Sequence, residues 1–135
     1  MDIASHALAG ACMGAAFGRP LLGAVCAILP DLVLPVKRIT EVTTSYTASH
    51  SLLVIVPSGV SLWVITGSVV PLLALLSHIL LDIPTHSKAW APALFFPLSS
   101  KRYSLGPDWE FFNASWCVGL TLTCIWSFSW LMFAV

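Results

Sequence analysis

The chain has 135 residues, of which 58% are hydrophobic and only 9% charged, and its formal net charge at pH 7 is zero. Its mean hydropathy of +0.91 excludes an ordinary soluble domain, since such domains are about 45–50% apolar and 25% charged. Six Lys and Arg residues are also too few for a nucleic-acid surface. We therefore predict an all-α fold, an integral membrane helical bundle of about five helices forming a single domain over residues 1–135.

The first two predicted helices are short and are joined by a tight hairpin. Residues 3–17 are apolar, and Gly10, Gly14 and the glycine of the following turn lie at four-residue intervals, a spacing that lets helix backbones approach closely. The turn Gly18-Arg19-Pro20 combines a helix stop with a helix-starting proline, so a second helix is expected over 21–36. At 1.5 Å per residue, both helices measure roughly 22–24 Å, less than the hydrocarbon core of about 30 Å.

Three further helices and two loops follow. In chain order they are a polar loop over 37–49, a helix from residue 50 or 51 to about 66, a helix over 69–83, an interfacial loop with amphipathic pieces over 87–112, and a helix over 113–135. Pro84 is expected to end the fourth helix, because proline cannot donate a hydrogen bond to the preceding turn.

The distribution of positive charge predicts the orientation of the bundle. If all five helices cross the membrane, five of the six basic residues share the N-terminal side and only Arg19 lies opposite. Because cytoplasmic loops carry an excess of Lys and Arg, we predict that the N-terminus and the long loops face the cytoplasm. Lys88, Lys101 and Arg102 of the predicted interfacial loop are then placed to attract anionic lipid head groups.

Ionisable side chains inside or beside apolar runs are the main indication of function. They are four histidines and two aspartates: His6, Asp31, His50, His78, Asp82 and His86. Such groups are costly against lipid, so they usually face a bundle interior and mark a functional site. The predicted topology places nearly all of them in the cytoplasmic half of the membrane, where one pocket can hold them.

Imidazole nitrogens and carboxylate oxygens are the ligands that hold zinc and related divalent ions. A bound ion would also neutralise carboxylates buried in an apolar bundle and lower the pKa of its water toward about 7. We predict one or two divalent ions, with zinc favoured, and expect Asp31 and Asp82 to be the catalytic carboxylates. The predicted metal ligands are His6, Asp31, His50, His78 and Asp82.

Two other ionisable residues have separate interpretations. His86 lies beyond Pro84 and is interpreted as an interfacial or substrate-contacting side chain. Asp108 precedes the last predicted helix, where a carboxylate caps free backbone amides.

These residues also resemble the signature of the membrane-bound metal-dependent hydrolases, small multi-span proteins of bacteria and archaea that are distantly similar to zinc-dependent phospholipase C and to single-strand-specific zinc nucleases. The similar stretches are His6-Ala7-Leu8-Ala9-Gly10, Leu29-Pro30-Asp31, Ser49-His50-Ser51, Ser77-His78 with Leu81-Asp82, and Trp90-Ala91-Pro92 with Pro97-Leu98-Ser99. The resemblance implies a protein of the cytoplasmic membrane that hydrolyses a phosphoester in a lipid or lipid-like substrate at the cytoplasmic leaflet.

The chain departs from that family pattern at three positions. Val33 stands where a second Asp is common, and Ser45-Tyr46 stands where a His-Arg pair is common. These departures favour an alternative, a metal-binding or transport membrane protein of the same fold without hydrolytic activity. Haem ligation by two histidines, such as His6 and His78, is disfavoured by the adjacent carboxylates, and a purely structural bundle is the remaining hypothesis.

Overall fold

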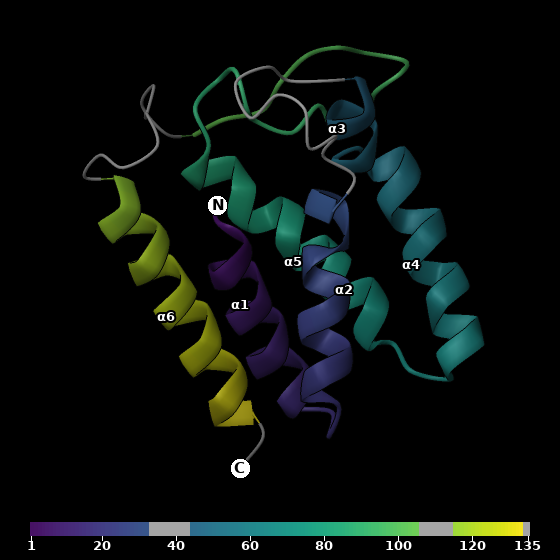
Figure 1. The fold of residues 1–135 in the computed structure, drawn as a ribbon, viewed down its shortest axis with the longest axis vertical. Coiled ribbons are helices and arrows are strands. Elements are labelled where there is room, and N and C mark those ends of the chain that lie inside the picture. Colours follow the sequence, from purple (N-terminus) through teal and green to yellow (C-terminus); the bar gives the residue numbers. More distant parts are fainter. Residues whose placement is uncertain (33–43, 106–114, 134–135) are drawn as a thin grey trace.

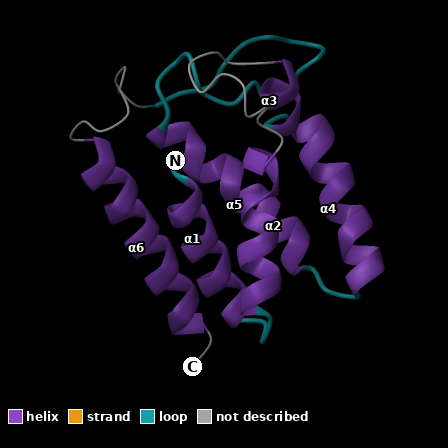
Figure 2. Cartoon of the chain, viewed as in Figure 1, coloured by secondary structure: helices purple, strands orange, loops and turns teal. Residues whose placement is uncertain are grey.

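The described part of the chain contains six helices and no strand. It comprises residues 1–32, 44–105 and 115–133 of a computed structural model. The helices are α1 (Ile3–Ala15), α2 (Pro20–Leu32), α3 (Thr44–Ser49), α4 (Leu52–Thr66), α5 (Val70–Thr85) and α6 (Ser115–Phe133). Figure 2 shows these helices joined by irregular loops, so the all-α prediction is confirmed.

Helix lengths differ from the expectation of five membrane crossings. None of the helices within 1–32, 44–105 and 115–133 is both long enough and apolar enough to span a membrane. The predicted end of the second helix over 33–36, the departure at Val33 and the predicted cap Asp108 all lie outside the described residues.

Two predicted boundaries were wrong. The polar loop over 37–49 ends in the six-residue helix α3, which is too short for a periodic pattern to reveal. Helix α5 continues past Pro84 to Thr85, and the amide of His86 still donates to the carbonyl of Asp82 at 3.0 Å. Proline so near a helix end removes a single helical hydrogen bond, and the surrounding packing outweighs that loss.

Helix α1 lies between α2 and α6 and also packs against α5, so its predicted central position is confirmed (Figure 1). Helix α5 crosses behind α1 and α2 and packs against α4 on the far side. The beginning of α1 and the end of α5 therefore meet at one end of the molecule, beneath the loop over 87–105 (Figure 1).

Asp2 fixes the start of α1. Its carboxylate accepts hydrogen bonds from the Ser5 amide at 2.9 Å and the Ser5 hydroxyl at 2.7 Å. Burial raises the pKa of Asp2, but these hydrogen bonds outweigh burial and hold that pKa below its ordinary value. The cap sets the register that turns His6 toward α5.

Helices α1 and α2 approach so closely that a side chain would not fit between them. A Cβ atom added at Gly10 would meet the carbonyl oxygen of Gly23 and the Cβ of Ala27. The predicted hairpin is confirmed, with α2 beginning at Pro20. Gly18 has φ +67° and nothing within 4 Å of an added Cβ, so it supports the turn rather than the helix contact that its spacing suggested.

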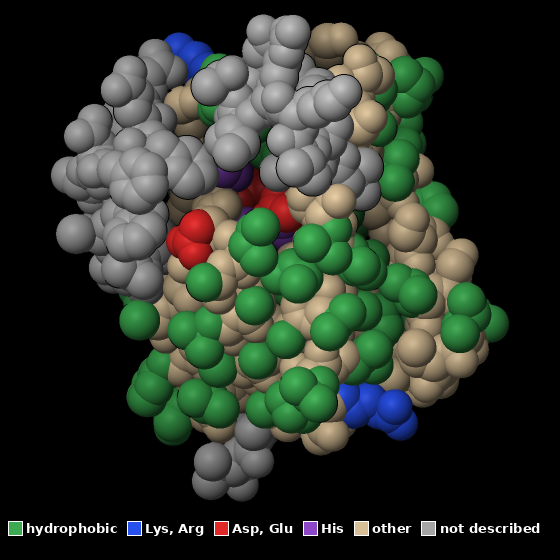
Figure 3. Space-filling view, in the orientation of Figure 1, with side chains coloured by type: hydrophobic (Ala, Val, Ile, Leu, Met, Phe, Trp, Pro, Cys, Tyr) green, Lys and Arg blue, Asp and Glu red, His purple; other side chains and the backbone are tan. Residues whose placement is uncertain are grey.

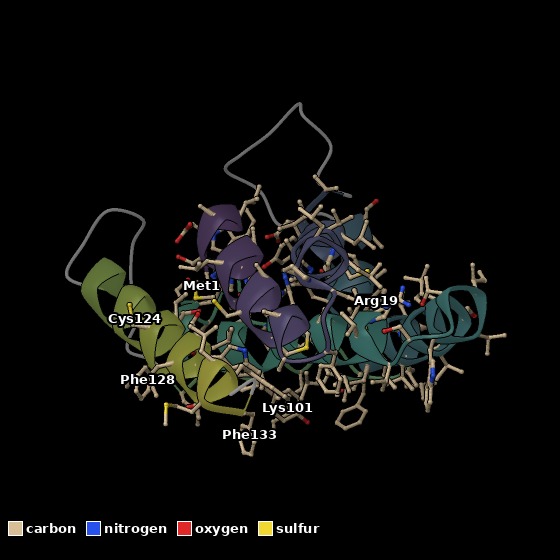
Figure 4. The ribbon with its side chains drawn as sticks, turned by 90° about the horizontal axis from the view of Figure 1, so that it is seen from below. Met1, Arg19, Lys101, Cys124, Phe128 and Phe133 are labelled. Carbon is tan, nitrogen blue, oxygen red and sulfur yellow. The ribbon has the colours of Figure 1, made fainter. Side chains whose placement is uncertain are left out.

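Large apolar side chains cover the outside of the bundle, as the front face in Figure 3 shows. On α4, Val64 and Ile65 are 78% and 77% exposed. On α6, Phe128 and Phe133 point away from the other helices (Figure 4) and are 66% and 82% exposed. Such extensive apolar surface is typical of contact with lipid or with another protein.

The close contact of α1 and α2 gives a test of the fold. We expect Gly10→Ala to lower the free energy of unfolding by about 1–3 kcal/mol, because the added methyl group overpacks a backbone contact. Thermal unfolding of the purified protein measures the change. Gly18→Asn is the matched control, since asparagine tolerates positive φ and the position is open. An unchanged melting temperature for Gly10→Ala would show that the helices separate freely.

Candidate metal centre

All five predicted metal ligands come together at the end of the bundle where α1 begins and α5 ends. His6 comes from α1, Asp31 from α2, His50 from the junction of α3 and α4, and His78 and Asp82 from α5. All five are buried, and the side chains of His50, His78 and Asp82 have no exposed surface. In Figure 3, acidic and histidine side chains are visible in a recess beyond the apolar face.

Backbone carbonyls determine which nitrogen of two central histidines carries a proton. The Nδ1 atom of His78 lies 2.6 Å from the carbonyl oxygen of Ala27, and Nδ1 of His50 lies 2.9 Å from the carbonyl oxygen of Tyr46. Because a carbonyl only accepts, each Nδ1 must donate, and the neutral ring then has no hydrogen on Nε2. The two Nε2 atoms nevertheless face each other at 3.1 Å. Two lone pairs at this distance need a shared proton or a cation between them.

Two carboxylates complete a ring of donor atoms around the facing nitrogens. Oδ1 of Asp31 lies 3.4 Å from Nε2 of His50 and 3.7 Å from Nε2 of His78. Oδ2 of Asp82 lies 3.5 and 3.2 Å from the same two nitrogens. Four ligands at zinc bond lengths of 2.0–2.2 Å in a tetrahedron would be about 3.3–3.6 Å apart. The observed spacings fit that arrangement closely.

Buried oxygens without partners support the same conclusion. Oδ2 of Asp31 and Oδ2 of Asp82 have no hydrogen-bond partner among the described residues, although each is fully shielded from solvent. An unpaired buried carboxylate oxygen is costly, and a coordinated cation removes that cost. Two buried sets of ligand atoms lie within 4.8 Å of one another, His6 with Asp31 and His78, and His50 with His78 and Asp82. The residues present therefore fit a divalent ion.

The other oxygen of Asp82 faces a different group of atoms. Oδ1 lies 2.9 Å from Nε2 of His6, 3.1 Å from Nε2 of His86 and 2.7 Å from the amino group of Met1. The sequence interpretation left His86 outside the cluster, and the structure places it there. Its position four residues after Asp82 was the available signal, which the expected helix end at Pro84 concealed.

Tyr46 closes one side of the centre and was missed as a site residue. Its ring stacks on His50 with centroids 3.9 Å apart, and its hydroxyl donates to the carbonyl of Trp90 at 3.0 Å. Burial raises the pKa of the Tyr46 phenol, and the negative charges of Asp82 and Asp31 raise it further. Tyr46 therefore remains a neutral hydrogen-bond donor beside the carboxylates.

Ser49 connects the histidine of one helix to the aspartate of another. Its hydroxyl lies 2.9 Å from the carbonyl oxygen of Pro30 and 3.0 Å from that of Tyr46, and 3.0 Å from Nδ1 of His50. Pro30 directly precedes Asp31, so this contact sets the distance between His50 and Asp31. Outer contacts of this kind orient metal ligands.

The loop over 87–105 is held over the centre by Arg102. The guanidinium donates to the carbonyl of Ala91 at 2.9 Å and to the hydroxyl of Thr47 at 3.1 Å. The amide of Leu52 donates to the carbonyl of Leu94 at 2.9 Å, which joins the loop to the start of α4. Lys101 is exposed, whereas Arg102 is engaged with protein acceptors rather than directed at a ligand.

The profile of the YdjM inner membrane protein family matches residues 1–135. The chain belongs to this family. Its description confirms the membrane part of the resemblance, and it does not mention zinc hydrolases. No curated protein and no solved structure matches the chain.

The contacts of Arg102 predict a structural role for this residue. We expect Arg102→Gln to lower the free energy of unfolding by about 1.5–3 kcal/mol, because hydrogen bonds from a charged donor are lost. Amide hydrogen exchange should accelerate at Tyr103, whose amide bonds to the carbonyl of Pro92. The exposed neighbour Lys101 provides the control Lys101→Gln, which should leave exchange unchanged. Equal protection in both variants would contradict this role.

Proposed function

We propose that this protein is a metal-dependent hydrolase of the inner membrane that cleaves a phosphoester in a lipid or lipid-like substrate at the cytoplasmic leaflet. The observation that carries the proposal is the pair of unprotonated Nε2 atoms of His50 and His78, 3.1 Å apart and flanked by two buried carboxylates. A shared proton would satisfy the nitrogens, but it would leave the unpaired oxygens of Asp31 and Asp82 unexplained.

The location rests on three independent features. Family membership indicates the inner membrane. The exposed apolar side chains of α4 and α6 suit contact with lipid tails. Lys88 and Lys101 belong to the loop at the end of the bundle that holds the metal centre, whereas Arg19 lies in the α1–α2 turn at the opposite end of α1. By the positive-inside rule, this charge difference directs the metal centre and the N-terminus toward the cytoplasm.

The residues that would hold a divalent ion, with zinc favoured by the nitrogen and oxygen donors, are His50, His78, Asp31 and Asp82, with His6 beside them. When bound, such an ion supplies Lewis acidity that activates water and stabilises charge on a phosphoryl oxygen. Asp31 is the better proton acceptor of the two carboxylates. Its side chain is 8% exposed and its Oδ2 has no described partner, whereas Asp82 is fully enclosed.

The loop over 87–105 suits a lipid substrate. Leu98 and Leu105 are each 83% exposed, and Lys88 and Lys101 are exposed beside them. Apolar side chains of this kind enter the acyl region of a membrane surface while the cations attract anionic head groups. The loop would thereby keep the metal centre near the phosphates of the leaflet.

The metal-dependent function has a direct test. Purified wild-type protein should contain at least one equivalent of divalent metal and hydrolyse a phospholipid or a generic phosphodiester. We expect a chelator to abolish turnover and zinc to restore it, and His78→Ala and Asp82→Ala to lose the metal. Elemental analysis and a phosphate-release assay measure both properties. Asp2→Asn is the matched control, because asparagine preserves the cap of α1. Wild-type protein without metal would refute the proposal.

A second function is favoured by the completeness of the ligand set. Structural zinc sites have four protein ligands, whereas catalytic sites usually have three and keep a position for water. His50, His78, Asp31 and Asp82 together offer four. A metal-binding or transport protein without hydrolytic activity would therefore contain the metal and show no turnover in the same assay.

Ser49 and Ser77 give a sharper test of the metal centre, because each directly precedes a histidine ligand. The Ser49 hydroxyl contacts the carbonyl beside Asp31, whereas the Ser77 hydroxyl donates to Ala74 within its own helix at 2.8 Å. We expect Ser49→Ala to weaken zinc binding roughly 10–100-fold, as loss of an orienting contact does. Ser77→Ala should leave affinity unchanged. Equal affinities in a competition titration with a zinc indicator would contradict the role of Ser49.

A further inference from the structure

We propose that the centre binds two divalent ions, with Asp82 as the bridging ligand and His86 as a ligand of the second ion together with His6. The inference rests on the proposed function and extends it, because His86 lies outside the ligand set that the sequence predicts.

The carboxylate of Asp82 divides the cluster into two halves. Its Oδ2 lies 3.2 Å from Nε2 of His78 and 3.5 Å from Nε2 of His50. Its Oδ1 lies 2.9 Å from Nε2 of His6 and 3.1 Å from Nε2 of His86. Each oxygen thus faces two imidazole nitrogens, and a carboxylate with this arrangement bridges two cations.

A single ion cannot use all four histidines through this carboxylate. His78 offers only Nε2, because its Nδ1 donates to the carbonyl of Ala27. Asp31 is also on the Oδ2 side, within 3.7 Å of both His50 and His78. The first ion therefore has His50, His78 and Asp31 as its own ligands, and His6 and His86 remain for the second. Stacking of His6 on His78, with ring centroids 3.7 Å apart, disfavours a positive charge on both rings.

The Oδ1 half already holds a positive charge in the structure. The amino group of Met1 lies 2.7 Å from Oδ1 of Asp82 and 2.7 Å from Nε2 of His86. A protonated amine only donates, so Nε2 of His86 is the acceptor and directs its lone pair at the same point as the carboxylate oxygen. This is the orientation that a metal ligand requires. An ion here has to displace that ammonium group, so the second ion should bind more weakly than the first.

Metal stoichiometry tests the inference. The full-length protein is titrated with Zn²⁺ by calorimetry and then assayed by elemental analysis after removal of free metal. We expect two sequential equivalents for wild type and one for His86→Gln. Ser104→Ala is the matched control, because the Ser104 hydroxyl donates to the carbonyl oxygen of His86 at 2.8 Å and leaves the imidazole ring unchanged. It should retain two equivalents.

The outcomes separate this inference from the proposed function. A single equivalent in wild type, or two in His86→Gln, would overturn the second ion site while leaving the metal-dependent function in place. No bound metal in wild type would overturn both. If His86→Gln fails to fold, Co²⁺-loaded wild type decides by electron paramagnetic resonance. Two equivalents with a magnetically coupled pair support the bridge through Asp82, and an uncoupled signal overturns it.

Discussion

Two imidazole rings with their Nδ1 atoms fixed on backbone carbonyls determine the character of this molecule. The hydrogen bonds from His78 to Ala27 and from His50 to Tyr46 leave the opposite nitrogens unprotonated and turn them toward each other inside an apolar bundle. Neither nitrogen can donate to the other, and the carboxylates of Asp31 and Asp82 only accept. A collection of acceptors without a donor is unfavourable in a low-dielectric interior, and a cation turns it into a favourable one.

The helix packing exists to bring these groups within reach of one another. Gly10 and Gly23 let α1 and α2 approach to backbone contact, which places His6 and Asp31 on opposite sides of α5. Helix α5 then supplies both His78 and Asp82 from one face, because residues four apart lie one turn above each other. The cost of positioning ligands from four segments is met by ordinary apolar packing between helices, far from the metal centre.

The surroundings of the centre combine rigidity on one side with exposure on the other. Tyr46, Ser49 and Arg102 hold α3 and the loop over 87–105 through hydrogen bonds to backbone carbonyls. The same loop presents Leu98 and Lys101 outward. The chain thus has a fixed inner wall for the ligands and an outer surface suited to a membrane, an arrangement in keeping with its membership of an inner membrane protein family.

The sequence alone identified the five clustered ligands, because an ionisable side chain in an apolar helix has few tolerable environments other than a shared interior site. It also determined the helical class, the hairpin at Gly18 and the α4 turn at Gly67, since these follow from local composition and backbone preference. Only the tertiary structure decided the imidazole tautomers, the division of Asp82 between two groups of nitrogens and the inclusion of His86. These depend on contacts such as that of Ala27 with His78, 51 residues apart, and on packing that carries α5 past Pro84. Neither local periodicity nor residue type encodes such contacts.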